Sequence, residues 1–185
     1  MSNKREKGIQ EWIASFGDNP AREGLRDTPR RVIKSWGFLC SGYHQKMEDL
    51  FTCFDAEGYD DIVLLKDIEF YSLCEHHLLP FFGKAHVGYL PGDKIIGISK
   101  LARVVDAFAR RLQTQERICK QVVDVLEEYL APRGAFCILE AVHLCMRMRG
   151  VEKQNSLMVC SSISGIFRDD FKIREELYSL LGRKF

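Results

Sequence analysis

The sequence predicts an α+β fold: an antiparallel sheet, two central helices packed on one of its faces, and a helical arm at the N-terminus. Apolar stretches bounded by turn residues, at 61–70, 84–90 and 135–149, are typical of strands. Between the second and third stretches lie two apolar stripes with helical spacing. The order of helices, strand pair, helix pair, strand pair and helix favours α+β over an alternating parallel fold.

Composition limits the classes of protein and partner. The chain has 185 residues, of which 46% are hydrophobic and 29% charged, enough for one domain with a substantial core. A net charge of +1 argues against a general nucleic-acid or membrane surface. No apolar run approaches the ~18 residues of a membrane span, and residues 1–7 lack the apolar core of a signal peptide. We therefore expect a cytoplasmic protein whose seven scattered cysteines are reduced.

The first 60 residues are expected to form the arm, and residues 61–185 the catalytic domain, as one structural unit. Residues 8–18 place apolar side chains at helical spacing and end at a glycine. A second helix is predicted with Thr28 as N-cap and Pro29 at its first position. Arg31 lies in its first turn, where an arginine either faces solvent or meets an anion.

The predicted strands 61–70 and 84–90 form a hairpin that carries a loop containing Cys74. After a further short strand, Ser99 is a good N-cap for the first central helix. Apolar residues then recur with helical spacing along both central helices, which we interpret as core: Leu101, Val104, Val105, Phe108, Leu112, Ile118, Val122, Val125, Leu126 and Tyr129.

Two short clusters carry zinc-type ligands. One runs from Cys74 to His77, and the other is His143-Leu-Cys145. Apolar and polar residues alternate from 142 to 149, so a continuous strand would place His143, Cys145 and Arg149 on one face. Thiolate and imidazole are the usual ligands of zinc.

The spacing alone leaves three interpretations of these clusters open. A catalytic zinc keeps three protein ligands, which Cys74, His77 and Cys145 would supply, and one position for water. His76 and His143 would then be available for proton transfer. A closed structural Cys₂His₂ site would use the same residues, and the third interpretation is that no metal binds.

Several long motifs, in the same order, strongly resemble those of GTP cyclohydrolase I. The resemblance covers essentially all of the chain from about Gly8. The motifs are Asn19-Pro-Ala-Arg-Glu-Gly-Leu-Arg-Asp-Thr-Pro-Arg-Arg-Val, Ser72-Leu-Cys-Glu-His-His-Leu-Leu-Pro-Phe-Phe-Gly-Lys, Gly97-Ile-Ser-Lys-Leu-Ala-Arg-Val-Val, Arg111-Leu-Gln-Thr-Gln-Glu-Arg and Ala141-Val-His-Leu-Cys-Met-Arg-Met-Arg-Gly.

The resemblance implies a tunnelling fold, in which the sheets of several subunits join into a barrel and two pentameric rings stack as a homodecamer. It implies Zn²⁺ held by Cys74, His77 and Cys145, with GTP as substrate. The implied activity is that of a cyclic amidine hydrolase at the first step of folate and pterin biosynthesis. Zinc lowers the pKa of a bound water to about 7 for attack on C8 of guanine. Formate is lost, and rearrangement of the ribose gives 7,8-dihydroneopterin triphosphate.

The resemblance also implies roles for individual residues. His143 and His76 are candidates to protonate N7 of the guanine, and Ser99 could assist later proton transfers near the ribose. Glu116, preceded by Gln115, would recognise guanine; the simpler interpretation of Glu116 is a first-turn carboxylate that meets the helix dipole. The positions that match triphosphate-binding residues are Lys100, Arg103, Arg149 and Arg31, some of them expected from neighbouring subunits.

Three other functions would share part of this pattern. A nucleobase deaminase would also use a cysteine-and-histidine zinc, but its His-x-Glu and Pro-Cys-x-x-Cys signature is absent. A tunnelling-fold reductase of deazaguanine precursors would need a nicotinamide cofactor and a nucleophilic cysteine. A non-enzymatic binding module stabilised by a structural zinc would have four protein ligands and would unfold when the zinc is chelated.

Overall fold

The computed structural model describes residues 2–182 and divides the chain into two compact units, Met1–Ser41 and Gly42–Phe185. The first unit contains α1 (Ser2–Ser15) and α2 (Thr28–Leu39). The N-cap of α2 is Asp27 rather than Thr28, because the Asp27 carbonyl already accepts a hydrogen bond from the Arg31 N–H at 3.1 Å. An arm extending to residue 60 stays a prediction. None of the helices in residues 2–182 is long and apolar enough to cross a membrane.

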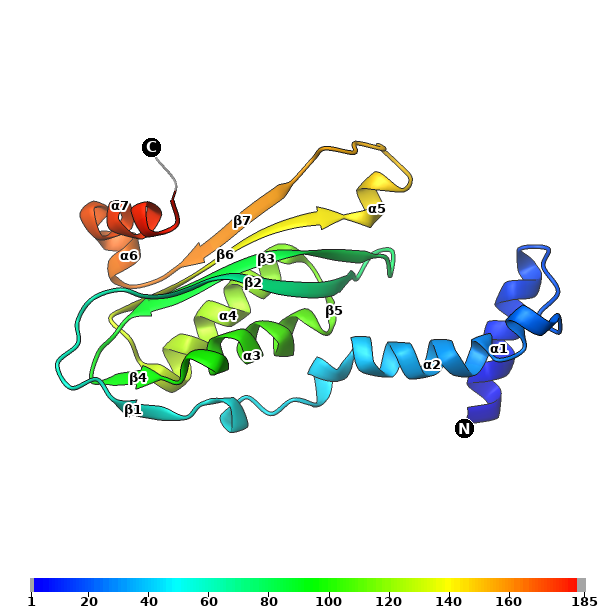
Figure 1. Ribbon diagram of the computed structural model, residues 1–185, viewed down its shortest axis with the longest axis horizontal. Helices are drawn as coiled ribbons and strands as arrows, with labels where there is room; N and C mark the ends of the chain where they lie inside the picture. The colour runs from blue at the N-terminus through cyan, green and yellow to red at the C-terminus, as the bar shows by residue number, and fades with distance from the viewer. Residues whose placement is uncertain (1, 183–185) are drawn as a thin grey trace. The chain divides into compact units, whose positions relative to one another are not determined.

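The second unit is built on a five-stranded sheet, drawn in Figure 1. The strands are β2 (Val63–Cys74), β3 (Pro80–Leu90), β5 (Leu112–Gln113), β6 (Gly134–His143) and β7 (Met158–Ile163), in the spatial order β5-β2-β3-β6-β7. All neighbouring pairs are antiparallel except β2 and β5, which are parallel. The predicted antiparallel hairpin around Cys74 is therefore confirmed. A separate two-stranded sheet pairs β1 (Cys53–Asp55) with β4 (Lys94–Ile96).

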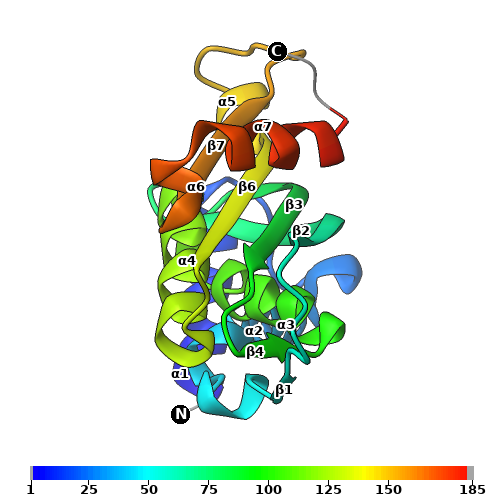
Figure 2. The ribbon, with the colours of Figure 1, turned by 90° about the vertical axis from the view of Figure 1, so that its left-hand side faces the viewer.

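Two helices cover one face of the five-stranded sheet, as predicted. Figures 1 and 2 show α3 (Ile98–Ala109) and α4 (Gln115–Leu130) side by side on this face. The predicted stripes are buried there, except that Leu112 lies in β5 and, like Tyr129, is only partly buried. Sheet residues in the same core cluster include Phe70, Phe81, Val87, Cys137, Leu139 and Ala141. α3 begins after Gly97 as its N-cap, so Ser99 is the second helical residue and not the predicted cap.

The opposite face of the sheet is covered at one end by two C-terminal helices. These are α6 (Ile166–Asp169), which the sequence did not predict, and α7 (Phe171–Leu180), which it did. Phe167 and Leu177 pack with Phe136 and Leu90 in a second apolar cluster. The Asp170 side chain caps α7 by accepting hydrogen bonds from the N–H groups of Lys172 and Ile173.

The approach of β3 to β6 requires glycine at position 83. A Cβ at Gly83 would lie 1.9 Å from the carbonyl oxygen of Glu140, which is backbone and cannot move aside cheaply. With glycine there, the two strands pair in a register that places Phe81 opposite His143. This register brings His143 to the end of the sheet where the Cys74 hairpin turns.

The predicted strand from 135 to 149 is wrong in its second half. β6 ends at His143, and the chain continues as α5 (Leu144–Arg147). The neighbouring strands no longer offer pairing partners, because β3 begins at Pro80 and β7 pairs with β6 only as far as Ala141. Backbone groups beyond His143 bond locally instead, as in the 2.9 Å bond from the Met148 N–H to the Leu144 carbonyl. Cys145 and Arg149 therefore do not follow His143 along one strand face.

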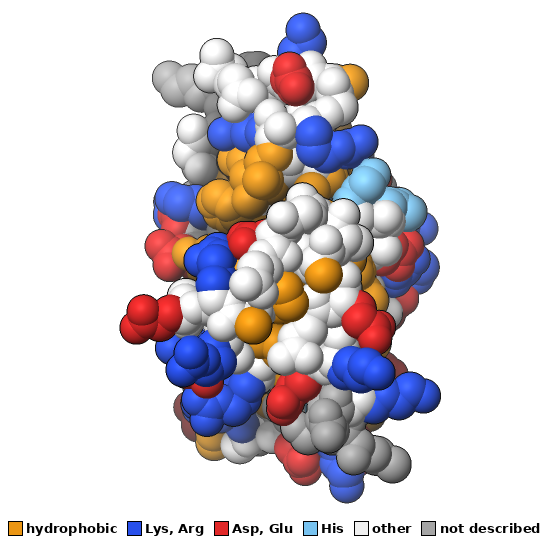
Figure 3. Space-filling view, turned by 90° about the vertical axis from the view of Figure 1, so that its right-hand side faces the viewer, with side chains coloured by type: hydrophobic (Ala, Val, Ile, Leu, Met, Phe, Trp, Pro, Cys, Tyr) orange, Lys and Arg blue, Asp and Glu red, His pale blue; other side chains and the backbone are white. Residues whose placement is uncertain are grey.

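Surface charge is mixed in sign. On the face shown in Figure 3, Lys and Arg side chains are interspersed with Asp and Glu, and histidine side chains reach the surface. This distribution matches the net charge of +1. Any anion site must therefore depend on a few local cations.

Candidate active site

The turn between β2 and β3 folds His77 back toward Cys74. The carbonyl of Cys74 accepts hydrogen bonds from the N–H groups of His77 at 3.3 Å and Leu78 at 2.8 Å. The Cys74 N–H donates to the carbonyl of Leu79 at 2.9 Å, and Leu78 has a positive φ of 56°. A turn this tight holds two metal-type ligands, three positions apart, on the same side of the hairpin end.

Cys145, in α5 directly after the end of β6, completes a group of three potential metal ligands. The Sγ atoms of Cys74 and Cys145 and a ring nitrogen of His77 all lie within 4.8 Å of one another. Zinc bonds of about 2.0–2.3 Å place tetrahedral ligand atoms about 3.3–3.8 Å apart, and Cys74 Sγ lies 3.7 Å from His77 Nδ1. The spacing therefore fits a single metal ion.

The chemistry of this group also fits a divalent metal. Burial and the neighbouring Cys74 thiol both raise the pKa of the Cys145 thiol, while Arg149 opposes them. Two such thiols ionise together once a divalent cation compensates their charge. Within residues 2–182 the group consists of Cys74, His77 and Cys145, the number of protein ligands that a catalytic zinc site uses.

His143 lies beside this group and is held on two sides. Its ring stacks on that of Phe81, with centroids 4.6 Å apart and planes 5° from parallel. Its Nε2 is 2.8 Å from Oε1 of Gln115, the first residue of α4. Burial lowers the pKa of His143, and the nearby Glu116 carboxylate opposes that shift.

His76 has a looser environment. Its Nδ1 is 3.9 Å from Cys74 Sγ, its Nε2 is 3.8 Å from Glu75 Oε1, and 66% of its side chain is exposed. Of the two histidines predicted to transfer protons, His143 is therefore the more firmly oriented.

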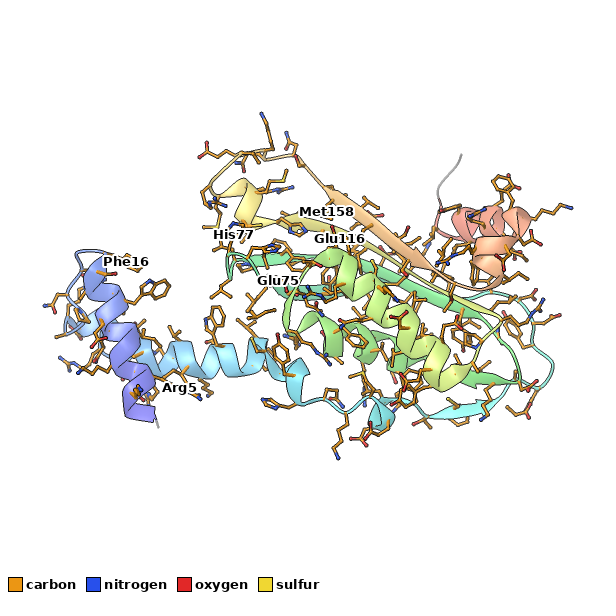
Figure 4. The ribbon with its side chains drawn as sticks, turned by 180° about the vertical axis from the view of Figure 1, so that it is seen from behind. Arg5, Phe16, Glu75, His77, Glu116 and Met158 are labelled. Carbon is orange, nitrogen blue, oxygen red and sulfur yellow. The ribbon has the colours of Figure 1, made fainter. Side chains whose placement is uncertain are left out.

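An ion pair that the sequence did not reveal ties the metal-ligand loop to α4. The guanidinium of Arg117 donates two hydrogen bonds to the Glu75 carboxylate, one of them at 2.9 Å, and lowers the pKa of that carboxyl. Figure 4 shows Glu75, His77, Glu116 and Met158 at the same end of the sheet, on the β2–β3 turn, the start of α4 and the start of β7. The first turn of α4 is thus part of the site.

Comparisons with known proteins show the family of the chain. The family model described as GTP cyclohydrolase I matches residues 5–182. The chain belongs to the GTP cyclohydrolase I family. It is 51% identical over 186 residues to GTP cyclohydrolase 1 of Methylococcus capsulatus, with full coverage of both chains. It is 54% identical over 172 residues to GTP cyclohydrolase 1 of Wolinella succinogenes, covering 92% of each chain.

A further relative, GTP cyclohydrolase 1 of Deinococcus radiodurans, is 51% identical over 179 residues, which are 96% of this chain and 82% of the relative. Among solved structures, the chain is similar to the apo form of the archaeosine synthase QueF-Like. That likeness has a TM-score of 0.46 and 16% identity, and it covers 57% of this chain and 94% of the other.

Some residues that the GTP cyclohydrolase I motifs single out for substrate binding lie beside the metal ligands. Glu116 is exposed in the first turn of α4, and its carboxylate has no hydrogen bond or ion pair within the part of the chain that is described. Arg149 follows α5 and donates to the Cys145 carbonyl at 2.7 Å. Gln115 is completely buried, in contact with His143.

Other residues singled out by the same motifs lie elsewhere. Ser99 and Lys100 are in the first turn of α3 and Arg103 is near its middle; α3 follows β4 and runs toward β5, the strand paired with Cys74 (Figure 1). A helix of 12 residues is about 18 Å long, so the start of α3 is far from the metal ligands of the same chain. Arg31 belongs to the first unit, where it is exposed and 3.7 Å from Asp27.

The sequence carries a local signal for the buried position of Gln115. Gln115 precedes Ile118 by three positions and Val122 by seven, which places it on the buried stripe of α4. A polar residue on an apolar stripe predicts a side chain engaged in buried hydrogen bonds. The Glu75–Arg117 pair had no such local signal, because it joins residues far apart in sequence.

Proposed function

We propose that this chain converts GTP into 7,8-dihydroneopterin triphosphate and formate at the site formed by Cys74, His77 and Cys145. The observation that carries the proposal is the open group of three metal ligands beside His143 and the exposed Glu116 carboxylate. Membership of the GTP cyclohydrolase I family, with about half of all residues identical to full-length relatives, supports the same reaction.

Zinc is the metal we propose for this group. Thiolate and imidazole ligands select zinc over magnesium, calcium or manganese, which prefer oxygen. When bound, zinc would supply a Lewis acid that lowers the pKa of water at the open position and so provides a nucleophile near neutral pH.

The surrounding side chains would bind the base and move protons. Glu116 can accept from N1–H and the 2-amino group of guanine, a pair of donors that adenine lacks, so the wrong base would leave the carboxylate unpaired. His143, when both of its ring nitrogens carry a proton, would give the Nδ1 proton to N7 of guanine, which draws electrons from the imidazole ring of the base before hydrolysis. Arg149 would contact the triphosphate, where a guanidinium suits phosphate oxygens.

We further propose that each site is completed by neighbouring subunits, in a homodecamer of two pentamers. The support is the position of Ser99 and Lys100 in the first turn of α3, at the end of that helix away from β5 and the strand position of Cys74. Activity per chain should fall when the assembly dissociates. Sedimentation velocity across a dilution series, with turnover measured on the same samples, tests this; monomers with full activity would refute the shared site.

The purified zinc-loaded protein should release formate from GTP while pterin absorbance and fluorescence increase. Removing the metal with a chelator should abolish both signals, and adding Zn²⁺ back should restore them. Formate without pterin would mean that ring opening occurs but the later rearrangement does not. Neither product from a folded, zinc-bound protein would reject the proposed reaction.

A further inference from the structure

The side chain of Gln115 has all of its hydrogen-bonding atoms engaged inside the protein. Its Nε2 donates to the carbonyl of Leu139 in β6 at 2.9 Å and to the carbonyl of Met158 in β7 at 3.1 Å. An amide nitrogen carries two hydrogens, so both are used. The orientation of the amide is therefore determined, because the flipped form would point Oε1 at two carbonyl oxygens.

This orientation fixes the hydrogen on His143. Gln115 Oε1 can only accept, and it lies 2.8 Å from His143 Nε2, so that nitrogen must be the donor. Parallel stacking on Phe81 fixes the plane of the same ring. Within residues 2–182, Nδ1 of His143 has no hydrogen-bond partner, which leaves it as the atom able to exchange a proton with a substrate.

We infer that Gln115 is a positioning residue that holds the ring of His143 and the hydrogen on its Nε2, so that Nδ1 faces the proton transfer. This inference rests on the proposed function, in which His143 transfers a proton to the guanine. It gives two adjacent residues different tasks. Successive residues on a helix point about 100° apart, so Gln115 faces the sheet while Glu116 is exposed and available to the base.

A double-mutant cycle tests this role. Gln115→Met has a similar shape but no hydrogen-bonding groups, and it should lower kcat for formate release by about 100-fold, with KM for GTP within about threefold of wild type. In the His143→Ala background, Gln115→Met should cause no further loss, because a residue that acts only through His143 has nothing left to position. Zinc content should stay at the wild-type level in all three variants.

Two comparisons separate positioning from general damage to the fold. Gln113→Met removes another buried amide, one that donates to the Phe108 carbonyl and to Gln121 without touching His143. It should lower thermal stability with little change in kcat. Gln115→Glu, protonated when buried, keeps one donor and one acceptor in the same shape, and should recover most of the lost kcat even if Gln115→Met folds poorly.

Some outcomes would overturn the inference. A rise in KM for GTP of about tenfold or more with kcat preserved would assign Gln115 to guanine binding instead. Losses that multiply in the double variant would show a role independent of His143. Wild-type protein that makes no formate would reject the proposed function itself. An active wild type with an unaffected Gln115→Met variant would reject only the positioning role of Gln115.

Discussion

Replacing Cys145 with alanine is expected to remove the zinc and to lower formate release from GTP by about 10³-fold or more. The substitution leaves two ligands, Cys74 and His77, on one tight turn. Two ligands from one hairpin do not define a tetrahedral site, and the third ligand atom in this group, the Sγ of Cys145, comes from α5.

The measurement pairs turnover with metal content. Formate release and zinc per chain should fall together in Cys145→Ala, while circular dichroism stays close to that of the wild type. The matched control is Cys53→Ala, which removes a partly buried thiol in β1 that is outside the ligand group. It should keep full zinc content and activity. A Cys145→Ala variant that retained stoichiometric zinc would contradict the assignment of this ligand.

A structural zinc would give another pattern in the same experiment. If the metal mainly held the fold together, Cys145→Ala would unfold or lose its cooperative thermal transition. The second unit has two apolar clusters, one on each face of the sheet, and four helices contribute to them. Of the three potential metal ligands, Cys74 and Cys145 contact the larger cluster, and the other members of both clusters lie outside the ligand group. We therefore expect the Cys145→Ala variant to fold but to lose zinc and formate release.

The helices and the hairpin could be predicted because their signals are local. Leu101, Val104, Val105 and Phe108 define the buried face of α3 by spacing alone, and burial confirms them. The clusters that contain Cys74, His77 and Cys145 could be found because few residue types bind zinc, but their spacing left three interpretations open until the GTP cyclohydrolase I motifs were compared. Among the described residues, these three lie close enough together to hold one metal ion.

The end of β6 could not be predicted in the same way. Alternation continues in the sequence through Cys145, Arg147 and Arg149, yet a strand lasts only as long as a neighbour supplies hydrogen bonds. Pairing partners are far away in sequence, so the change to α5 after His143 has no local signal. The same holds for Arg117 and Glu75, which are 42 positions apart.

Replacing His143 is expected to slow the chemistry without releasing the metal. His143→Ala should lower kcat for formate release by about 10²–10⁴-fold, the range for loss of a general acid or base. It also leaves Gln115 Oε1 without its donor in a buried position, at a cost of about 1–3 kcal/mol in stability. Activity must therefore be compared at a temperature where the variant is fully folded.

His143→Gln separates the two effects of that substitution. Its amide can still donate a hydrogen bond toward Gln115, so stability should recover, but an amide does not transfer a proton near neutral pH. We expect kcat as low as in His143→Ala, with stoichiometric zinc in both variants. His44→Ala, which removes an exposed histidine outside the site, should match the wild type.

The same assay compares His143 with His76. His76 is largely exposed and has only long contacts with Cys74 and Glu75, whereas His143 is fixed by Phe81 and Gln115. A group that is already oriented loses less freedom in reaching the transition state, so His143→Ala should cost more in formate release than His76→Ala. A His143→Gln variant within about tenfold of wild-type kcat would show that His143 is not the proton donor.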